Sequence, residues 1–387
     1  TIVAVPQNAP TGTLRINIRQ AGTASVENDY YEPQSLGWSS SALRDYKVYA
    51  IPSTAQAVLK MDPQTHAVDR LPTTHFKSSA YCGAVATKAG VIVATPSDAS
   101  DILVIEADDT ITYRSLGSLE ESVTGEKWCG AEVVDVPSST GATEFIYAAP
   151  FYATSILKLN NDGSVHSYFD ITQYVPEIAA YNAPFFDGIV AYGTTLVCVP
   201  AHSKAPLFIN VTSGIEEFRV VEADSYPDLQ VTQGVHKYAG GTIVPSEEAV
   251  YFHPYDARYI MKVSFADATN PSVSFLPHLL SFGTDKYRAG ALVGHLGTSE
   301  QALVMAPYEA AGLLTITWDS SGIERVSVLP PSYKRHVPIA SLITVTSDLF
   351  FGIPASGQDI IKFTVKDWDL RRMAIDTSLQ PVPPSED

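Results

Sequence analysis

Short runs of alternating apolar and polar residues, separated by Gly, Pro, Asp and Ser, extend along most of the chain. Segment 91–116 is typical: the run VIVATP is followed by a turn, by DILVIE, by an Asp-Asp turn and by TITYRSL. Alternation with a period of two indicates β-strands, and helical periodicity is almost absent. The pattern therefore predicts an all-β protein made of short strands joined by tight turns.

One corner recurs along the chain: an apolar run ends in a proline, a short polar segment turns the chain, and a second apolar run begins. An apolar residue stands seven positions after each proline, from Leu59 to Ile361. The aligned prolines are Pro52, Pro96, Pro150, Pro200, Pro254, Pro307 and Pro354. Four-stranded units of roughly 40–50 residues, repeated at least four times, are typical of a β-propeller. We therefore expect a single seven-bladed β-propeller of four-stranded blades.

The expected propeller domain covers residues 1–366, and a polar C-terminal tail covers 367–387. The blades are expected at about 37–72, 80–117, 128–170, 185–221, 236–277, 287–329 and 337–366. The last unit lacks an outermost strand, whereas segment 13–19 alternates strictly between apolar and polar residues. We expect 13–19 to complete the last blade, because closing the ring removes an exposed strand edge. An eighth copy at 3–16 is an alternative, but it lacks a preceding inner strand.

A second element precedes each proline: an aromatic residue, then any residue, then a small residue. The aromatic residues are Trp38, Tyr81, Trp128, Phe186, Tyr238 and Tyr287, and the lysines directly before three of them are Lys127, Lys237 and Lys286. The last unit departs from this pattern and reads HVPIA at 336–340. In a propeller this element and the proline corner should flank one mouth of the central channel. Two interpretations stay open: packing of one blade against the next, or a ring that binds an anionic or sugar-like ligand.

On these residues, the units resemble a propeller repeat found in large, mostly uncharacterised proteins of algae and other protists. That repeat has the form K-[WY]-x-G-G followed by [YF]-x-x-P-x-x-A-x-x-[VI]-L. The resemblance covers about 38–366, although several copies in this chain are degenerate. It implies the propeller fold and no particular activity.

The turning residues of the corners differ in their polar side chains, which is how a constant scaffold diversifies a binding face. The channel-mouth candidates among them are Tyr152, His202, His253 and Asp256. Drift in a solvated loop produces the same variation. Some propeller hydrolases and lactonases hold Ca²⁺ or Mg²⁺ on the axis with oxygen-rich ligands. The candidates for such a site are Glu132, Asn182, Asp187, His202, His253 and Asp256. No HExxH or GxSxG motif is present, so we assign no catalytic residue, no metal ligand and no cofactor.

Charge and cysteine content narrow the classes of protein further. The net charge is −17 and the basic residues are scattered, which argues against a nucleic-acid partner. No apolar stretch approaches 18 residues, so we expect a soluble protein without a spanning segment. Cys82, Cys129 and Cys198 form no CxxC pair. We expect Cys82 and Cys129, at matching positions of successive blades, to lie beyond the roughly 7 Å that a disulfide tolerates.

Free buried thiols favour a reducing compartment. Against this stands one glycosylation sequon at Asn210, which would matter only in a secreted protein. Because the chain begins at Thr1, an upstream targeting segment could have been removed. The compartment stays open on the sequence alone.

Three functions are compatible with these observations. The first is a non-catalytic propeller that serves as a protein-binding platform or as an accessory subunit of a larger assembly. The second is a propeller that binds a carbohydrate or another small ligand at the aromatic mouth. The third is a hydrolase or lactonase dependent on a divalent metal.

Overall fold

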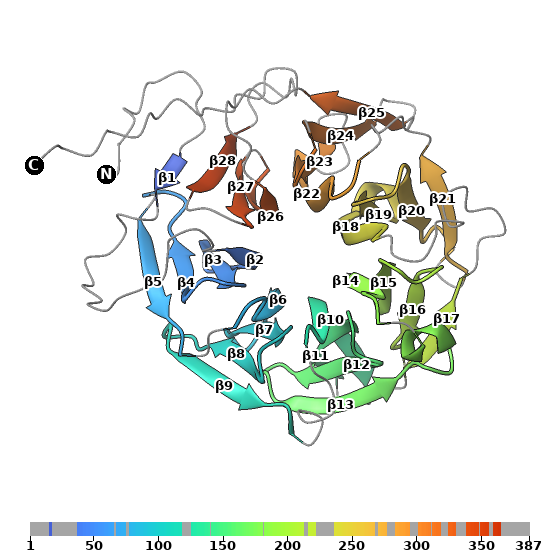
Figure 1. Cartoon of the computed structure of the whole chain (residues 1–387), viewed down its shortest axis with the longest axis horizontal. Coiled ribbons are helices and arrows are strands. Elements are labelled where there is room, and N and C mark those ends of the chain that lie inside the picture. The colour runs from blue at the N-terminus through green and yellow to red at the C-terminus, as the bar shows by residue number, and fades with distance from the viewer. Residues whose placement is uncertain are drawn as a thin grey trace, which may run out of the picture.

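The computed structural model is an all-β propeller whose blades surround a central axis (Figure 1). The inner strands lie around the axis and the outer strands lie at the periphery. The structure describes residues 15–17, 37–65, 67–74, 77–117, 125–139, 141–180, 182–212, 216–221, 236–267, 270–276, 283–294, 301–310, 312–318, 324–329, 338–347, 349–355 and 359–364. The expected tail 367–387 lies outside these residues.

Six sheets each consist of four antiparallel strands that are consecutive in sequence. They are β2–β5 (Trp38–Arg44, Lys47–Pro52, Ala57–Met61, Val68–Pro72), β6–β9 (Tyr81–Ala86, Ile92–Pro96, Asp101–Ile105, Ile111–Ser115) and β10–β13 (Trp128–Ser138, Gly141–Pro150, Ser155–Asn160, Val165–Asp170). They continue with β14–β17 (Phe186–Tyr192, Thr195–Pro200, Leu207–Asn210, Glu217–Val220), β18–β21 (Tyr238–Val244, Ala249–Pro254, Ile260–Ser264, Ser272–Leu276) and β22–β25 (Tyr287–Gly294, Gln301–Pro307, Leu313–Trp318, Glu324–Leu329). The prediction of a propeller with four-stranded antiparallel blades is confirmed.

The remaining four-stranded sheet differs from these six contiguous blades because it joins two distant parts of the chain. It contains β26 (Ile339–Thr346), β27 (Leu349–Pro354), β28 (Asp359–Thr364) and β1 (Arg15–Asn17), with β1 at the outer edge. β1 pairs antiparallel with β28, with Arg15 opposite Ile361. The inner strands β2 and β26 contact each other, which closes the ring of inner strands. The other residues of the expected closing strand 13–19 lie outside the described part of the chain.

The helices among the residues that the structure describes are short 3₁₀ turns in the connections, η3 (Pro176–Ala179) and η4 (Pro245–Glu247). Within the described ranges, no helix has the length and apolar character needed to cross a membrane.

The backbone of each proline corner is hydrogen-bonded to the aromatic element of its own blade. In the third blade, for example, the N–H of Phe151 donates to the carbonyl of Lys127 at 2.8 Å. The residue after the proline makes this bond in every blade, and the donors are Ser53, Ser97, Phe151, Ala201, Tyr255, Tyr308 and Ala355. The corner and the aromatic element therefore lie side by side at one mouth of the channel.

The same corners also connect neighbouring blades. The carbonyl of Phe151 accepts the N–H of Phe185, the residue before the aromatic of the next blade, at 2.8 Å. The equivalent blade-to-blade donors are Ala80, Lys127, Phe185, Lys237 and Lys286. Pro338 stands at the equivalent position of the β26 blade and has no N–H to donate. The main role of the recurrent proline corner is thus to connect one blade to the next by backbone hydrogen bonds.

The hydrophobic core lies between blades rather than within them. One cluster joins Tyr49 and Val58 of the first blade to Tyr81, Ile92 and Leu103 of the second, and all five side chains are buried. Equivalent clusters lie between the other blade pairs, for example around Trp128 and around Tyr238. Burial of large aromatic side chains at a fixed position in each blade is how repeat proteins stabilise each unit against its neighbour.

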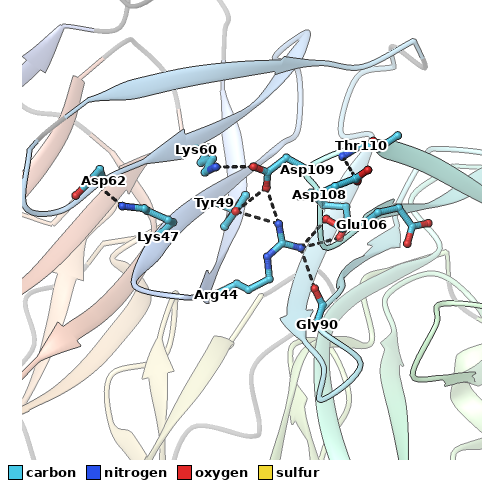
Figure 2. Close-up of polar contacts among 11 residues, drawn as sticks. Arg44, Lys47, Tyr49, Lys60, Asp62, Gly90, Glu106, Asp108, Asp109 and Thr110 are labelled. Carbon is cyan, nitrogen blue, oxygen red and sulfur yellow. Dashed lines mark hydrogen bonds and ion pairs between the residues drawn. The ribbon is translucent and has the colours of Figure 1, made fainter.

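One set of polar contacts, in which a tyrosine and a lysine of one blade share a carboxylate of the next, recurs with a period of two blades. In Figure 2, Lys60 and Tyr49 of the first blade both bond the carboxylate of Asp109 in the β8–β9 turn of the second, at 2.5 and 2.7 Å. Arg44 joins the same carboxylate at 2.6 Å. Two later pairs of blades repeat this set, with the tyrosine and the lysine on the second and third strands of one blade and the acid in the next blade. The sets are Tyr147–Lys158–Glu216 and Tyr251–Lys262–Glu324. These contacts fix the rotation of one blade relative to the next.

Candidate functional site

The second residue of the inner strand, which follows the aromatic where the blade has one, faces a cavity at the propeller axis in every blade except that of β18. Six of these residues line a cavity of about 240 Å³: Ser39, Cys82, Cys129, Asp187, Arg288 and Ala340. In each blade the pairing register shifts near the start of the inner strand, for example between Tyr287 and Ala289 or between Cys129 and Glu132. Such a β-bulge re-aims the side chain next to it. The bulges therefore turn one residue per blade from the sheet towards the channel.

Glycines behind these residues let neighbouring inner strands approach backbone to backbone. Gly130 has φ +81°, and a Cβ placed there would lie 2.6 Å from the Cα of Gly188 in the next blade. Gly83 stands in the same relation to Gly130 one blade earlier, with 2.6 Å to its carbonyl carbon. Only glycine fits a left-handed conformation at this separation. The ring is consequently tight where Cys82, Cys129 and Asp187 line it.

The expectation of free, separated thiols at Cys82 and Cys129 is wrong. The structure joins them in a disulfide with a Cα–Cα separation of 4.6 Å, and only Cys198 remains as a free, buried cysteine. The physical reason is the close approach of the glycine bulges, which brings matching positions of successive blades together near the axis. The expected Cα–Cα separation beyond 7 Å therefore does not hold for these two residues near the axis.

Asp187 forms the charged centre of the cavity wall. Its Oδ2 lies 2.9 Å from Nε2 of His236 and 3.4 Å from Nη2 of Arg288. Burial alone would raise the pKa of Asp187, but the Arg288 charge and the His236 hydrogen bond outweigh it and lower the pKa below its usual value. Arg288 in turn lies 3.7 Å from Sγ of Cys82 and 3.8 Å from Sγ of Cys129. One guanidinium thus contacts a carboxylate and two sulfur atoms.

Glu132 on β10 presents a second carboxyl group to the cavity. It keeps partial exposure to the cavity but is otherwise surrounded by protein, and this desolvation raises its pKa to about 8. Within the described part of the chain, its carboxyl interacts with the backbone N–H of Val133 and with no side chain. Glu132 is therefore the cavity group whose hydrogen-bonding capacity is least used by the protein itself.

His253 also borders the cavity, but its ring is fully engaged. Nδ1 lies 3.1 Å from the carbonyl oxygens of Ala239 and Arg288, and Nε2 lies 2.8 Å from the hydroxyl of Thr242. Carbonyls only accept, so Nδ1 carries the proton and Nε2 accepts from Thr242. Burial lowers the pKa of His253 to about 4, which keeps the ring neutral. This histidine braces two inner strands.

The aromatic candidates do not line the cavity. Each is at most 2% exposed and packs into an inter-blade cluster: Trp38, Tyr81, Trp128, Phe186, Tyr238 and Tyr287. Their placement fits the packing interpretation, and a ligand-binding aromatic ring stays a prediction.

The lysine candidates Lys127, Lys237 and Lys286 are buried as well. Nζ of Lys237 donates to the carbonyl of Ala201 at 2.8 Å, and Nζ of Lys286 donates to that of Gly283 at 2.7 Å. Burial lowers the pKa of Lys237 to about 8. Lys237 thus supports the proline corner of the preceding blade, and Lys286 supports the connection before β22.

The corner candidates lie around the mouth without converging on one point. The ring of Tyr152 packs edge-on against Phe151, and that of His202 packs against Phe185. Asp256 accepts the backbone N–H groups of His236 and Asp285 at 3.1 and 2.9 Å. Asp256 therefore holds the backbone of His236, whose ring contacts Asp187.

The proposed Ca²⁺ or Mg²⁺ ligands are not gathered into a site. Glu132, Asp187 and His253 border the cavity, whereas Asn182 is exposed in the connection before β14. Across the described ranges, the grouping of three or more His, Cys, Asp or Glu ligands is Cys82, Cys129 and Asp187.

The sequence held a signal for this site. The position between the aromatic and the small residue reads Ser, Cys, Cys, Asp, Ala, Arg and Ala along the blades. The residues with reactive or charged side chains at this position are Cys82, Cys129, Asp187 and Arg288. His236 precedes the element and carried no such signal.

Comparisons with known proteins place the chain in the class of β-propellers. It resembles the selenomethionine-substituted virginiamycin B lyase from Staphylococcus aureus, with a TM-score of 0.63 and 12% identity over 91% of this chain and 99% of that one. It also resembles Kuenenia stuttgartiensis hydrazine synthase, with a TM-score of 0.57 and 10% identity over 88% and 99% of the two chains. The β-propeller domain of Cps50 (Swd1) from Myceliophteria thermophila gives a TM-score of 0.53 and 13% identity over 86% and 100%.

These similarities concern the fold alone, because each identity is far below 25%. No family model matches the chain, and no curated protein matches it. The resemblance to the K-[WY]-x-G-G repeat accordingly stays a prediction.

Proposed function

We propose that the protein binds a small polar ligand carrying a protonated nitrogen in the axial cavity. The observation that carries this proposal is Glu132, an enclosed carboxyl that faces the cavity without a side-chain partner among the described residues. Buried carboxyl groups are costly unless they are paired, and a ligand cation would supply the missing partner. This proposal develops the small-ligand alternative and moves its site from the aromatics to the bulge residues.

The size and charge of the cavity support such a ligand. Its volume of about 240 Å³ is below the roughly 300–1,000 Å³ of sites for drug-sized molecules. The Asp187 carboxylate is matched by Arg288, so Glu132 is the acidic group left for a ligand. Backbone of the glycine bulges forms much of the remaining wall and can orient a polar molecule by hydrogen bonds.

Glu132→Gln tests this proposal. We expect methylammonium and ethanolammonium to raise the melting temperature of the wild-type protein, and methanol and ethylene glycol at equal concentration not to raise it. The isosteric amide should abolish the ammonium-dependent increase. Calorimetry in buffers of different ionisation enthalpy should show a proton released on binding near pH 7, because a cation favours the carboxylate over the acid.

The pH dependence of stability provides an independent check. The folded protein holds the Glu132 proton up to about pH 8, whereas an unfolded chain releases it near the usual value of 4.5. The free energy of unfolding should therefore fall as the pH rises through this window, and Glu132→Gln should remove that part of the decrease. Equal ammonium responses in wild type and variant would contradict the proposed site.

A second proposal retains the protein-binding platform that the sequence favours first. It is supported by Tyr46, whose side chain is 74% exposed in the turn between β2 and β3. Its φ is +57°, a conformation that is unfavourable for a tyrosine. Neither the backbone conformation nor packing within the described structure therefore explains a tyrosine at this position. A protein partner would cover this ring at the end of β3 opposite its proline corner.

Tyr46→Asn should separate partner binding from folding, because asparagine tolerates a positive φ. The melting temperature should stay equal or increase, while a partner that co-purifies with the native protein should be lost from the complex on size-exclusion chromatography. A native protein that elutes as a monomer, or a variant that keeps the partner, would contradict the platform at this turn.

A further inference from the structure

Three side chains at the cavity wall form a group with metal-ligand chemistry. The Sγ atoms of Cys82 and Cys129 and a carboxylate oxygen of Asp187 all lie within 4.8 Å of one another. Cys129 and Asp187 are buried, and Cys82 is partly exposed towards the cavity. In the disulfide state the two sulfur atoms are bonded to each other, so they are not available to a metal ion.

We propose that reduction of the disulfide converts this group into a site for one thiophilic divalent cation of the Zn²⁺ type. A dithiol reductant transfers two electrons and two protons to the disulfide and is itself oxidised to its own disulfide. The cation then displaces one proton from each of the two thiols and binds Cys82, Cys129 and Asp187. The disulfide and a bound metal ion exclude each other, because both use the sulfur atoms of Cys82 and Cys129.

The distances between the ligand atoms suit tetrahedral coordination. Zn–S bonds of about 2.3 Å and Zn–O bonds of about 2.0–2.2 Å place ligand atoms roughly 3.5–3.8 Å apart. Atoms already gathered within 4.8 Å need only a small adjustment once the sulfur atoms separate. Cys82 and Cys129 are held by strands whose glycine bulges are in contact, so reduction leaves the two residues as neighbours.

The charge of the surroundings is balanced for a divalent cation. Two thiolates and one carboxylate carry three negative charges, and a divalent cation with Arg288 supplies three positive ones. Arg288 lies 3.7 and 3.8 Å from the two sulfur atoms, which places its N–H groups to donate to metal-bound thiolates. Without a metal the two thiols keep their protons, and Arg288 then faces the single charge of the Asp187 carboxylate.

The surroundings also orient the oxygen ligand. Nε2 of His236 lies 2.9 Å from Oδ2 of Asp187, and His236 is itself held at its backbone N–H by Asp256. An outer residue in contact with a ligating carboxylate is typical of metal sites, where such residues fix the ligand direction. We assign His236 as a positioning residue. The fourth coordination position would be left to water or to a small molecule in the cavity.

The choice of cation follows from the sulfur ligands. Thiolates favour Zn²⁺, Cd²⁺ and Co²⁺-type coordination over Ca²⁺ and Mg²⁺, which require oxygen ligands. The proposal thus differs from the oxygen-ligand site considered for the hydrolase alternative. It is also independent of Glu132, because that carboxyl is not among the grouped ligand atoms.

Cobalt binding by the whole protein tests the site. The protein is reduced with an excess of dithiothreitol, freed of reductant without oxygen, and titrated with Co²⁺. We expect one equivalent to bind, with a thiolate-to-cobalt charge-transfer band and visible bands of tetrahedral intensity. The oxidised protein should show neither, and Zn²⁺ should displace the bound Co²⁺.

Matched variants under the same reducing conditions show whether Co²⁺ binds specifically to the Cys82–Cys129–Asp187 group or to any reduced thiol. Cys82→Ser and Cys129→Ser should lose the charge-transfer band, whereas Cys198→Ser should keep it. Asp187→Asn should weaken Co²⁺ binding, and His236→Gln should weaken it by about 10–100-fold while the band position is retained. Circular dichroism confirms that each variant remains folded, and X-ray absorption on the Zn²⁺ form should show two sulfur neighbours at about 2.3 Å.

Several outcomes would overturn the proposal. They are a reduced, folded protein that binds no Co²⁺, an equal loss of the band in Cys198→Ser, or full binding by Cys82→Ser. Glu132→Gln distinguishes this result from the proposed ammonium site: it should lose the ammonium response and keep Co²⁺ binding. Failure of either site therefore leaves the other one testable.

Discussion

Gly130→Ala should destabilise the propeller strongly, by about 3–5 kcal/mol in the free energy of unfolding. Two costs combine at this position. The residue has φ +81°, which penalises any side chain, and the added Cβ would lie 2.6 Å from the Cα of Gly188 and 2.9 Å from the N of Ile189. These are backbone atoms of the next blade, so no side-chain rotation can relieve the overlap. Urea unfolding at a fixed temperature measures the loss.

Gly90→Ala is the matched control for this prediction. Gly90 has φ +80°, but the nearest atom to an added Cβ is the Cβ of Ala107 at 3.9 Å, an ordinary contact. The control should lose only the conformational part, about 1–2 kcal/mol. Equal losses in the two variants would show that the inner strands are free to move apart, and the tight axial ring would be wrong.

The fold could be predicted from the sequence because each blade repeats the same local information. A proline such as Pro150 ends the second strand and an apolar residue follows it seven positions later in each unit, while a buried aromatic such as Trp128 begins the inner strand. Repetition reduces the effect of any degenerate copy. The composite sheet was harder to predict, because β1 is separated from β28 by almost the whole chain. The missing outermost strand of the last unit and the strict alternation of 13–19 indicated it.

The site was less predictable because it depends on a departure from regular strand geometry. Ideal alternation assigns the residue after Trp128 to the opposite side of the sheet from the aromatic and gives no reason for Cys129 to meet Cys82. The bulge and the glycine contact change both the direction of the side chain and the distance between blades. The sequence therefore indicated Asp187 only as a candidate oxygen ligand for Ca²⁺ or Mg²⁺, and it gave no indication that Cys129 contacts Cys82.

Glu216→Gln should cost about 3–5 kcal/mol, because it leaves the Lys158 ammonium buried without its counter-ion. Nζ of Lys158 lies 2.5 Å from Oε1 of Glu216, and the two side chains are only 4% and 8% exposed. The carboxylate also accepts the hydroxyl of Tyr147 at 2.8 Å, so the pair connects the third and fourth blades. The loss should appear as a lower midpoint of urea unfolding with an unchanged slope.

An exposed pair with the same separation supplies the comparison. Nζ of Lys88 and Oδ2 of Asp135 are also 2.5 Å apart, but their side chains are 67% and 48% exposed, and Asp135→Asn should cost no more than about 1 kcal/mol. The double variant Lys158→Met with Glu216→Gln should recover most of the stability, because it removes the unpaired charge and leaves the amide to accept from Tyr147. Equal losses for Glu216→Gln and Asp135→Asn would contradict a buried inter-blade pair. If the double variant recovers no stability, the loss in Glu216→Gln does not come from the unpaired Lys158 ammonium. The ion pair itself would then be the stabilising interaction.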